Sequence, residues 1–300
     1  MSEFTKRITA SPLQPLASLS FRLISRLDYL FFDALYAISG DSKPNQDEID
    51  FVKKNVTFIY KSFERQNMAT RLYKSIQSYY PGVKVIIADD SRIPLEIVGD
   101  CVEIIHLPFN TGVSAGLNKA LQAVKTPFLV KLDDDELLTR RTKIGEQLHF
   151  LMNHPEVDLV AFCPLTAVLC KNPDKHVEVA YNKFSMEEAP RKLLIPHMTK
   201  LDDSHIVMGK TPNCFLARTE SIKKIGWDDN IRMIDHHEFF YRAAGILVAV
   251  AAKGTVIFHY HNVFNRKYQS YRMDIESDLI YIRAKRILER EKLMEKMKLE

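Results

Sequence analysis

The sequence contains little cysteine and no short cysteine spacing. Its four cysteines stand at positions 101, 163, 170 and 214. This excludes the C-x-x-C pair of a zinc or redox site and the cysteine density of a disulfide-rich secreted domain. We therefore expect reduced and mostly buried thiols.

A marked excess of either charge is also missing. The 42 basic and 38 acidic residues are spread along the chain and give a formal charge of +4. Such a balance predicts no broad surface for polyanions, so nucleic acid is not an expected partner.

Long apolar runs are absent as well. The most apolar early stretch, Leu19 to Ile38, is interrupted by four charged residues, which argues against a membrane crossing. The first residues lack the pattern of a secretory signal, so we expect a cytoplasmic protein. Helical spacing of the apolar positions predicts an amphipathic helix that packs on the protein's own surface. The alternative is a peripheral contact with a membrane or partner through residues 19–38.

The glycine-rich phosphate loop of dinucleotide-dependent dehydrogenases is missing too. Gly112 and Gly116 do not complete a G-x-G-x-x-G motif. A hydride-transfer enzyme of that class is therefore not expected.

Short strands rich in valine, isoleucine and phenylalanine alternate with helices from about residue 55. Val56 to Tyr60 and Val83 to Ala88 are predicted strands on either side of a predicted helix at Met68 to Tyr80. The alternation predicts an α/β protein, with a Rossmann-like, mainly parallel sheet and helices on both faces. We expect a helical N-terminal extension at residues 1–50, one large domain at 51–265 and a charged C-terminal helix at 266–300.

Two acidic clusters follow predicted strands. Asp89 and Asp90 end one strand, and Asp133, Asp134 and Asp135 follow the apolar strand Pro127 to Leu132. Ligands of such sheets bind beyond the carboxyl ends of the strands. Three adjacent carboxylates repel one another, and Mn²⁺ or Mg²⁺ would relieve this repulsion while bridging to a diphosphate. The alternative is a solvated acidic turn.

The order of these motifs resembles the nucleotide-sugar half of GT-A glycosyltransferases with the family-two pattern. The carriers are Ala88-Asp89-Asp90-Ser91, the segment Pro108 to Asn118, and Leu132-Asp133-Asp134-Asp135. Further segments look like the animal β-1,4-N-acetylgalactosaminyltransferases, and this resemblance spans roughly residues 55 to 262. These segments are Asn213 to Thr219, Ile225-Gly226-Trp227-Asp228, His236 to Phe240, and Val256 to His259.

The resemblance implies a GT-A catalytic domain and assigns roles to individual residues. The donor would be bound by Thr57, Asp89, Asp90, Asn110, Gly112, Asn118, Asp133 and Asp134. The implied metal ligands are Asp135, Asp133 and His259. Glu238 is the candidate general base, and His236 is the reserve candidate. The relatives carry a membrane anchor, whereas this chain shows no such segment.

Several of these residues also have simpler explanations. Glu238 and Arg242 are four residues apart, so they could form a surface ion pair on a helix. Trp227 could stack on a sugar or belong to the core, and Phe239 and Phe240 are expected in the core.

We therefore expect an inverting transfer of an N-acetylhexosamine or hexose from a UDP-sugar to a glycan or glycolipid hydroxyl, assisted by Mn²⁺ or Mg²⁺. The alternatives are a retaining GT-A transferase, a sugar-phosphate nucleotidyltransferase and an inactive nucleotide-sugar binding protein.

Overall fold

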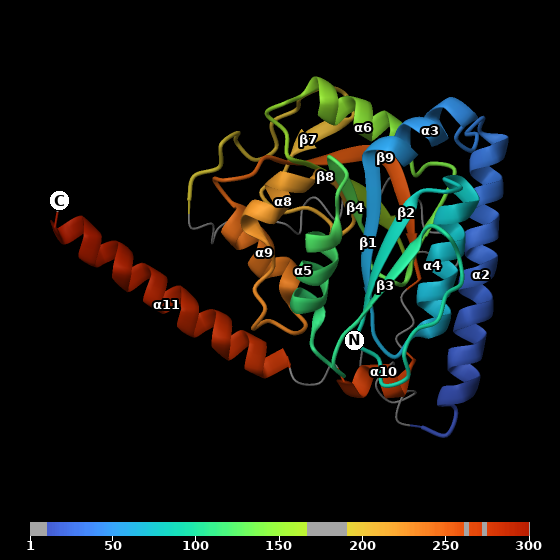
Figure 1. Cartoon of the computed structure of the whole chain (residues 1–300), viewed down its shortest axis with the longest axis horizontal. Helices are drawn as coiled ribbons and strands as arrows, with labels where there is room; N and C mark the ends of the chain where they lie inside the picture. Colours follow the sequence, from blue (N-terminus) through green and yellow to red (C-terminus); the bar gives the residue numbers. More distant parts are fainter. Residues whose placement is uncertain (1–10, 167–190, 261–263, 272–274, 300) are drawn as a thin grey trace.

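The computed structural model describes residues 11–166, 191–260, 264–271 and 275–299. Helices cover both faces of a twisted central sheet, and the long helix at the C-terminal end projects away from this body (Figure 1). The predicted α/β fold, with helices on both faces of the sheet and helical segments at both ends of the chain, is confirmed. The division of the chain at residues 50 and 265 stays a prediction.

The first half of the sheet is parallel. Its order is β3-β2-β1-β4, with β1 hydrogen-bonded to both β2 and β4. The bounds are β1 (Val56–Ser62), β2 (Lys84–Asp89), β3 (Val102–His106) and β4 (Phe128–Lys131). In this register Asp89 lies level with Ser62, and Lys131 lies level with Ile59. The acidic clusters that follow β2 and β4 therefore lie at the same edge of the sheet.

The second half of the sheet is mixed. β8 (Phe215–Arg218) pairs antiparallel with β4 and with β6 (Leu159–Leu165), and β9 (Ala249–His259) runs parallel to β6. β5 (Glu136–Leu138) and β7 (His205–Val207) both pair antiparallel with β9. The prediction of parallel pairing thus holds for the nucleotide-sugar half and not for the rest of the sheet.

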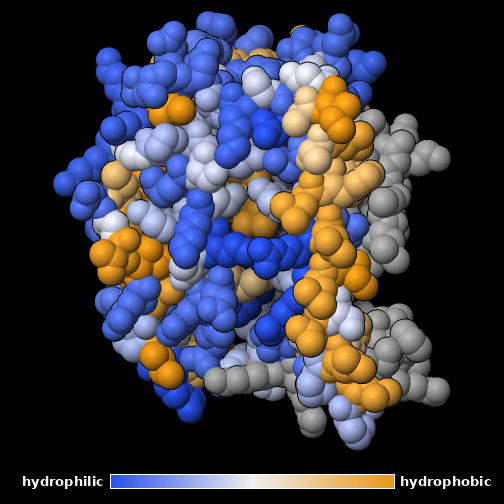
Figure 2. Space-filling view, turned by 90° about the vertical axis from the view of Figure 1, so that its right-hand side faces the viewer, coloured by the Kyte–Doolittle hydropathy of each residue, from blue (hydrophilic) through white to orange (hydrophobic). Residues whose placement is uncertain are grey.

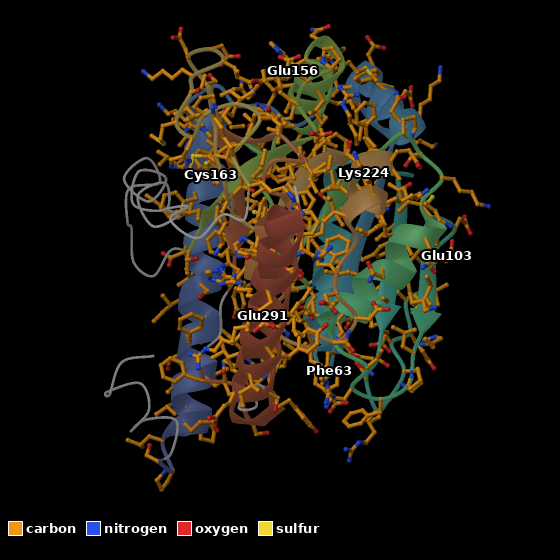
Figure 3. All side chains as sticks on the ribbon, turned by 90° about the vertical axis from the view of Figure 1, so that its left-hand side faces the viewer. Phe63, Glu103, Glu156, Cys163, Lys224 and Glu291 are labelled. Carbon is orange, nitrogen blue, oxygen red and sulfur yellow. The ribbon has the colours of Figure 1, made fainter. Side chains whose placement is uncertain are left out.

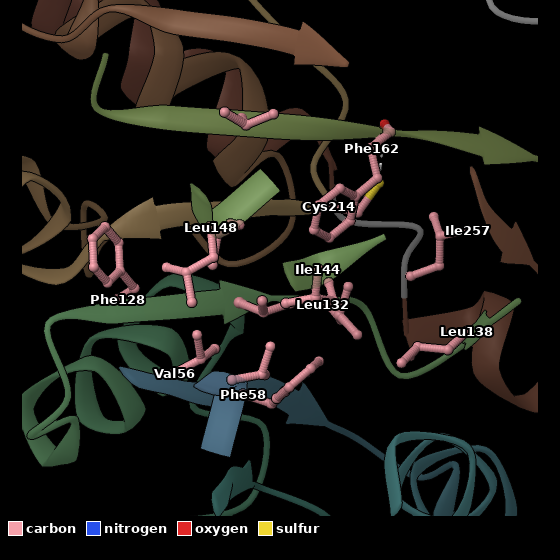
Figure 4. Packing of buried hydrophobic residues seen from close by; sticks show 14 of the residues in the cluster. Val56, Phe58, Phe128, Leu132, Leu138, Ile144, Leu148, Phe162, Cys214 and Ile257 are labelled. Atoms are coloured by element: carbon pink, nitrogen blue, oxygen red, sulfur yellow. Dashed lines mark hydrogen bonds between the residues drawn. The ribbon is translucent and has the colours of Figure 1, made fainter. Parts of the chain in front are cut away.

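Alternating residues of the strands fill two separate cores. Phe58 and Val130 point to one face and Ile59 and Leu129 to the other. Figure 4 shows the first core, which contains Phe162 from the middle of β6. This face is covered by α3 (Gln46–Asn55), α4 (Gln66–Tyr79) and α6 (Ile144–Asn153), and the other by α5 (Val113–Ala123), α8 (Thr219–Ile225) and α9 (Asp235–Ala243). Each fully buried phenylalanine contributes about 1.5–3 kcal/mol to folding.

The short elements α3, β5 and β7 were not predicted. Helix α3 lies directly before β1, in a segment to which the sequence assigned no separate helix. Asn45 caps this helix by accepting the backbone N–H of Glu48 at 2.9 Å, a local signal that the sequence carries. Strand β5 begins at Glu136, directly after the acidic run.

Helix α2 (Gln14–Ile38) lies along the outside of the molecule with its apolar side exposed. Phe32 and Tyr36 pack against the ends of β5 and β9, but Ser25 and Asp28 are also on the buried face. Figure 2 shows the outward stripe of apolar side chains running along the helix. The stripe consists of Leu16, Leu19, Leu23, Leu27, Leu30, Phe31, Leu35 and Ile38, which are 40% to 83% exposed. Packing on the protein's own surface therefore does not account for these residues. Among the described residues, no helix has the length and apolar character of a membrane span.

Candidate functional site

A cavity of about 320 Å³ opens at the edge of the sheet where β1, β4 and β9 end. Its walls come from the ends of these strands, the loop before α5, the first residues of α9 and α10 (Arg266–Tyr271). The predicted site residues that line it are Asn110, Gly112, Asp133, Asp134, Asp135, His236 and His259. The fold therefore joins residues from about position 110 with residues from about position 259 in one hollow.

The buried end of the acidic run is held by Arg65. Its guanidinium bonds both oxygens of Asp134, and its Nη1 donates to Oδ2 of Asp135 at 2.8 Å. The same guanidinium lies over the ring of Tyr268, 3.9 Å from the ring centre. This cation therefore already opposes the repulsion between the two carboxylates.

The two carboxylates differ in electrostatic environment. Burial raises the pKa of Asp134 to about 7, with Arg65 opposing and Asp135 adding repulsion. Burial alone would also raise the pKa of Asp135, but Arg65 and His259 outweigh it, so this pKa lies well below its usual value. Asp135 is thus the more firmly ionised member of the pair.

The imidazole of His259 lies beside Asp135. Its Nε2 is 3.5 Å from Oδ1 of Asp135, and its Nδ1 is 3.1 Å from the hydroxyl of Thr166. Burial would lower the pKa of His259, but Asp135 raises it to about 9. Asp133, Asp135 and His259 have the right chemistry for a divalent cation, yet the described residues contain no group of three ligands arranged to hold one. In the arrangement described, Arg65 and His259 supply the positive charge that opposes the repulsion between the carboxylates.

A second cluster surrounds Lys131, which is fully buried at the end of β4. Its ammonium donates to Oδ1 of Asp133 at 2.6 Å and to the carbonyl of Asn213 at 2.9 Å. Asp235, the first residue of α9, is 6% exposed and lines the cavity. Burial raises the pKa of Asp235 to about 6, while Lys131 opposes this and Asp133 reinforces it. Its Oδ2 is buried and finds no hydrogen-bond partner within the described part of the chain.

The loop before α5 is shaped by Asp90. Its Oδ2 accepts the backbone N–H of Gly112 at 3.0 Å, and Lys61 lies 2.6 Å from its other oxygen. Gly112 has a φ of 110°, and a Cβ there would come within 3.1 Å of the Arg232 backbone. A glycine is therefore required for the loop to approach the segment before α9.

Five predicted site residues do not line the cavity, and Asp90, described above, is one of them. Thr57 is at the opposite end of β1, where it accepts a hydrogen bond from Thr126. Asp89 accepts Ser91 Oγ at 2.6 Å and the N–H of Leu95 at 2.8 Å. These hydrogen bonds stabilise the local structure, and none of the partner residues lines the cavity.

Asn118 and Glu238 also serve contacts elsewhere. The side chain of Asn118 bonds both the backbone N–H and the carbonyl of Trp227. Oε1 of Glu238 accepts Nε of Arg242 at 2.5 Å and Nζ of Lys285 at 2.8 Å. The ion pair with Arg242 that the sequence spacing allowed is thus present, and Glu238 does not line the cavity.

The reserve base His236 does line the cavity, but its Nε2 lies 2.6 Å from the carbonyl of Thr211. Burial and then Lys210 lower its pKa to about 3, so the imidazole is neutral and weakly basic. Trp227 is 5% exposed and stacks on Phe239 with ring centres 5.3 Å apart. Trp227 therefore belongs to the core, the second of its two predicted roles. Phe239 and Phe240 are core residues as predicted.

The sequence did not single out several cavity residues. Asp235 directly precedes His236, so a helix start at Asp235 would have been the signal. Arg65 is 69 residues from Asp134, and no local pattern connects them. Arg232, whose guanidinium donates to the carbonyl of Asn110, also comes from a distant loop.

Three features together define a GT-A glycosyltransferase domain. They are the parallel β-α-β half, the acidic run at the end of β4, and the cavity that the second half of the sheet closes. The chain belongs to glycosyl transferase family 2, whose family model matches residues 57–226.

Two mammalian relatives show sequence similarity to the chain. It is 31% identical over 212 residues to mouse beta-1,4 N-acetylgalactosaminyltransferase 2, which covers 69% of this chain and 40% of that protein. It is 29% identical over 213 residues to human beta-1,4 N-acetylgalactosaminyltransferase 1, which covers 68% and 38%. The chain therefore spans about two fifths of the length of these relatives.

Solved structures share the fold. The mannosyltransferase PcManGT from Pyrobaculum calidifontis, in complex with GDP-Man and Mn²⁺, has a TM-score of 0.50 at 16% identity, covering 92% of this chain and 76% of that one. S. aureus TarS 1-349, in complex with UDP-GlcNAc, has a TM-score of 0.50 at 14% identity, covering 68% and 58%.

The cavity wall that contains Asp235 depends on the helix at the C-terminal end. Asp278, in the first turn of α11 (Ile275–Leu299), is 3% exposed and accepts the backbone N–H groups of Arg232, Met233 and Ile234 at 2.7 to 3.1 Å. Asp278→Ala leaves these donors unpaired and should lower the free energy of unfolding by about 1–3 kcal/mol. Amide hydrogen exchange should become faster at residues 232–236.

Glu276→Ala is the matched control, since Glu276 is exposed on the same turn. Equal exchange rates at residues 232–236 in Asp278→Ala and wild type would show that α11 does not organise this wall.

Proposed function

We propose that this chain transfers an N-acetylhexosamine or a hexose from a UDP-linked donor to a hydroxyl group of a glycan or glycolipid. The names of the two mammalian relatives support N-acetylgalactosamine transfer, and the UDP-GlcNAc in the TarS complex supports a UDP-linked donor. Membership of glycosyl transferase family 2 supports the reaction class.

One observation carries the proposal. A buried carboxylate with an unpartnered oxygen, Asp235, lines the same cavity as the acidic run at the end of β4. Its pKa of about 6 is close to the pH at which a general base works well. The geometry favours Asp235 over Glu238 as the base, because two cations already bind Glu238 outside the cavity.

The proposed reaction is a direct displacement with inversion. Asp235 accepts the proton of the acceptor hydroxyl, and the hydroxyl oxygen forms a bond to the anomeric carbon. The bond from this carbon to the donor diphosphate breaks, and its electron pair leaves with the diphosphate oxygen. Lys61, Arg65 and Arg232 line the cavity and provide positive charge for the nucleoside diphosphate that departs.

A divalent cation stays part of the proposal, with Asp133, Asp135 and His259 as its ligands. The oxygen and imidazole chemistry of these residues supports it, as does the Mn²⁺ in the archaeal mannosyltransferase complex. Since Arg65 bonds Asp135 in the described arrangement, a cation would have to displace it. When bound, the ion would add positive charge beside the diphosphate.

The Asp235 assignment can be tested by substitution. Asp235→Asn should lower turnover about 10²- to 10⁴-fold, because the amide keeps the shape but accepts no proton. UDP should still raise the melting temperature of the variant, since donor binding is retained. Turnover is measured as UDP released from UDP-N-acetylgalactosamine and UDP-N-acetylglucosamine, with a panel of glycan and glycolipid acceptors and with water.

Glu238→Gln is the matched control and should lower stability more than turnover, because it weakens the contacts with Arg242 and Lys285. A variant of Asp235 with normal turnover, together with an inactive Glu238→Gln or His236→Ala, would move the role of base to that residue. Wild-type protein that no UDP-sugar stabilises, with or without Mn²⁺, would contradict the proposed donor.

The place of Arg65 gives a prediction on metal affinity. Arg65→Gln should bind Mn²⁺ roughly ten- to a hundredfold more tightly than wild type. The charged hydrogen bond from Arg65 to Asp135 contributes about 1.5–3 kcal/mol, and in the variant it no longer competes with the metal ion for the carboxylate. Binding is followed by Mn²⁺ electron paramagnetic resonance without donor.

Arg232→Gln removes a positive charge from the same cavity without a described contact to Asp134 or Asp135, so it controls for net charge. Equal gains in the two variants would indicate a general charge effect and no displacement of Arg65.

A further inference from the structure

A second and larger cavity of about 970 Å³ lies between α2 and α4. It shares Arg65 and Tyr268 with the donor cavity, so the two hollows meet at these side chains. Neither the predicted donor site nor the proposed reaction uses it.

The larger cavity has an excess of positive charge. Arg22 and Arg26 from α2 and Arg71 and Lys74 from α4 line it, and none of them pairs with a carboxylate within the described part of the chain. Among the described residues that line it, Glu64 is the one acidic side chain. An anion would supply the missing negative charge.

Arg71 strengthens this argument. Its guanidinium lies 3.9 Å from the ring centre of Tyr260, and its Nε is buried without a hydrogen-bond acceptor in the described residues. Burial lowers the pKa of Arg71 below its usual value, although Tyr260 opposes the shift. A phosphate in the cavity would provide the acceptor that this Nε lacks.

The rim of the cavity is apolar. Leu23 and Leu30 line it and are 56% and 54% exposed, so the outward stripe of α2 forms one of its edges. Figure 2 shows this stripe beside a hollow bordered by hydrophilic residues. Exposed basic residues next to a long apolar helix face are typical of helices that lie in the surface of a membrane.

We propose that the cavity binds the phosphate headgroup of an anionic membrane lipid while the stripe of α2 lies among the acyl chains. Such a lipid satisfies both features, whereas a soluble phosphate would leave the leucines in water. A second copy packed on the stripe would leave the arginines unpaired. One consequence rests on the proposed function. A lipid bound at this site holds the donor cavity at the membrane surface, where a glycolipid acceptor is presented.

The test is co-sedimentation of the full chain with vesicles of phosphatidylcholine alone or mixed with phosphatidylglycerol. Wild type should bind the mixed vesicles more tightly. Arg22→Gln with Arg26→Gln should weaken that binding roughly tenfold or more, because each basic residue near an anionic surface contributes separately. Leu23→Gln with Leu27→Gln should reduce binding to both kinds of vesicle, and glutamine preserves helix propensity.

Matched controls lie elsewhere on the surface. Lys125→Gln with Lys224→Gln removes the same number of charges, and Figures 1 and 3 place Lys224 and α8 away from α2. Ile280→Gln with Leu288→Gln removes comparably exposed apolar residues from α11. Both controls should bind vesicles as wild type does.

Three outcomes would overturn the proposal. The first is that wild type binds no vesicles. The second is that the arginine variant binds vesicles as tightly as wild type does, while inorganic phosphate prevents vesicle binding completely, which indicates a soluble ligand. The third is a dimer in light scattering that the leucine variant converts to a monomer, which assigns the stripe to a second copy. Stabilisation by UDP is measured in parallel, so a failure of the donor proposal is seen separately.

Discussion

The concentration of buried carboxylates at one edge of the sheet is the constraint on which the site depends. Parallel strands bring their carboxyl ends together, so Asp134 and Asp135 line the cavity, and Asp90, distant from them in sequence, bonds Gly112 and Lys61 of its wall. A buried carboxylate is stable only with a cation or several N–H donors. Arg65, Lys61 and the loop before α5 take their positions because they provide these partners.

The same requirement separates structural carboxylates from a reactive one. Glu238 and Asp278 are each satisfied by several donors, and they fasten α11 to the wall of the cavity. Asp235 keeps a buried oxygen without a partner in the described residues and has a raised pKa. A group that is enclosed but incompletely satisfied is suited to proton transfer, because gaining a proton relieves its desolvation.

Helix α2 shows an opposite arrangement to that of an ordinary surface helix. Ser18, Ser25 and Asp28 face the protein. The leucines of the helix face outward beside Arg22 and Arg26, which pair with no carboxylate among the described residues. Apolar side chains left in water contribute no burial to folding, and a contiguous exposed apolar face is typical of surfaces that contact a membrane or another protein. The larger cavity links that face to the donor cavity through Arg65 and Tyr268.

The sequence by itself determined the parallel half of the sheet and the acidic run at its edge, because alternating apolar residues and strand ends are local patterns. It also indicated the family, through the order of motifs between residues 55 and 262. Only the tertiary structure decided which of the predicted residues share the cavity. Thr57 was predicted to bind the donor like Asn110, yet the strand direction places it at the opposite end of β1. Glu238 was preferred to His236 as the base, yet it binds Arg242 and Lys285 outside the cavity. The pairing of Arg65 with Asp134 joins positions 69 residues apart, and such a contact depends on how the chain folds back on itself.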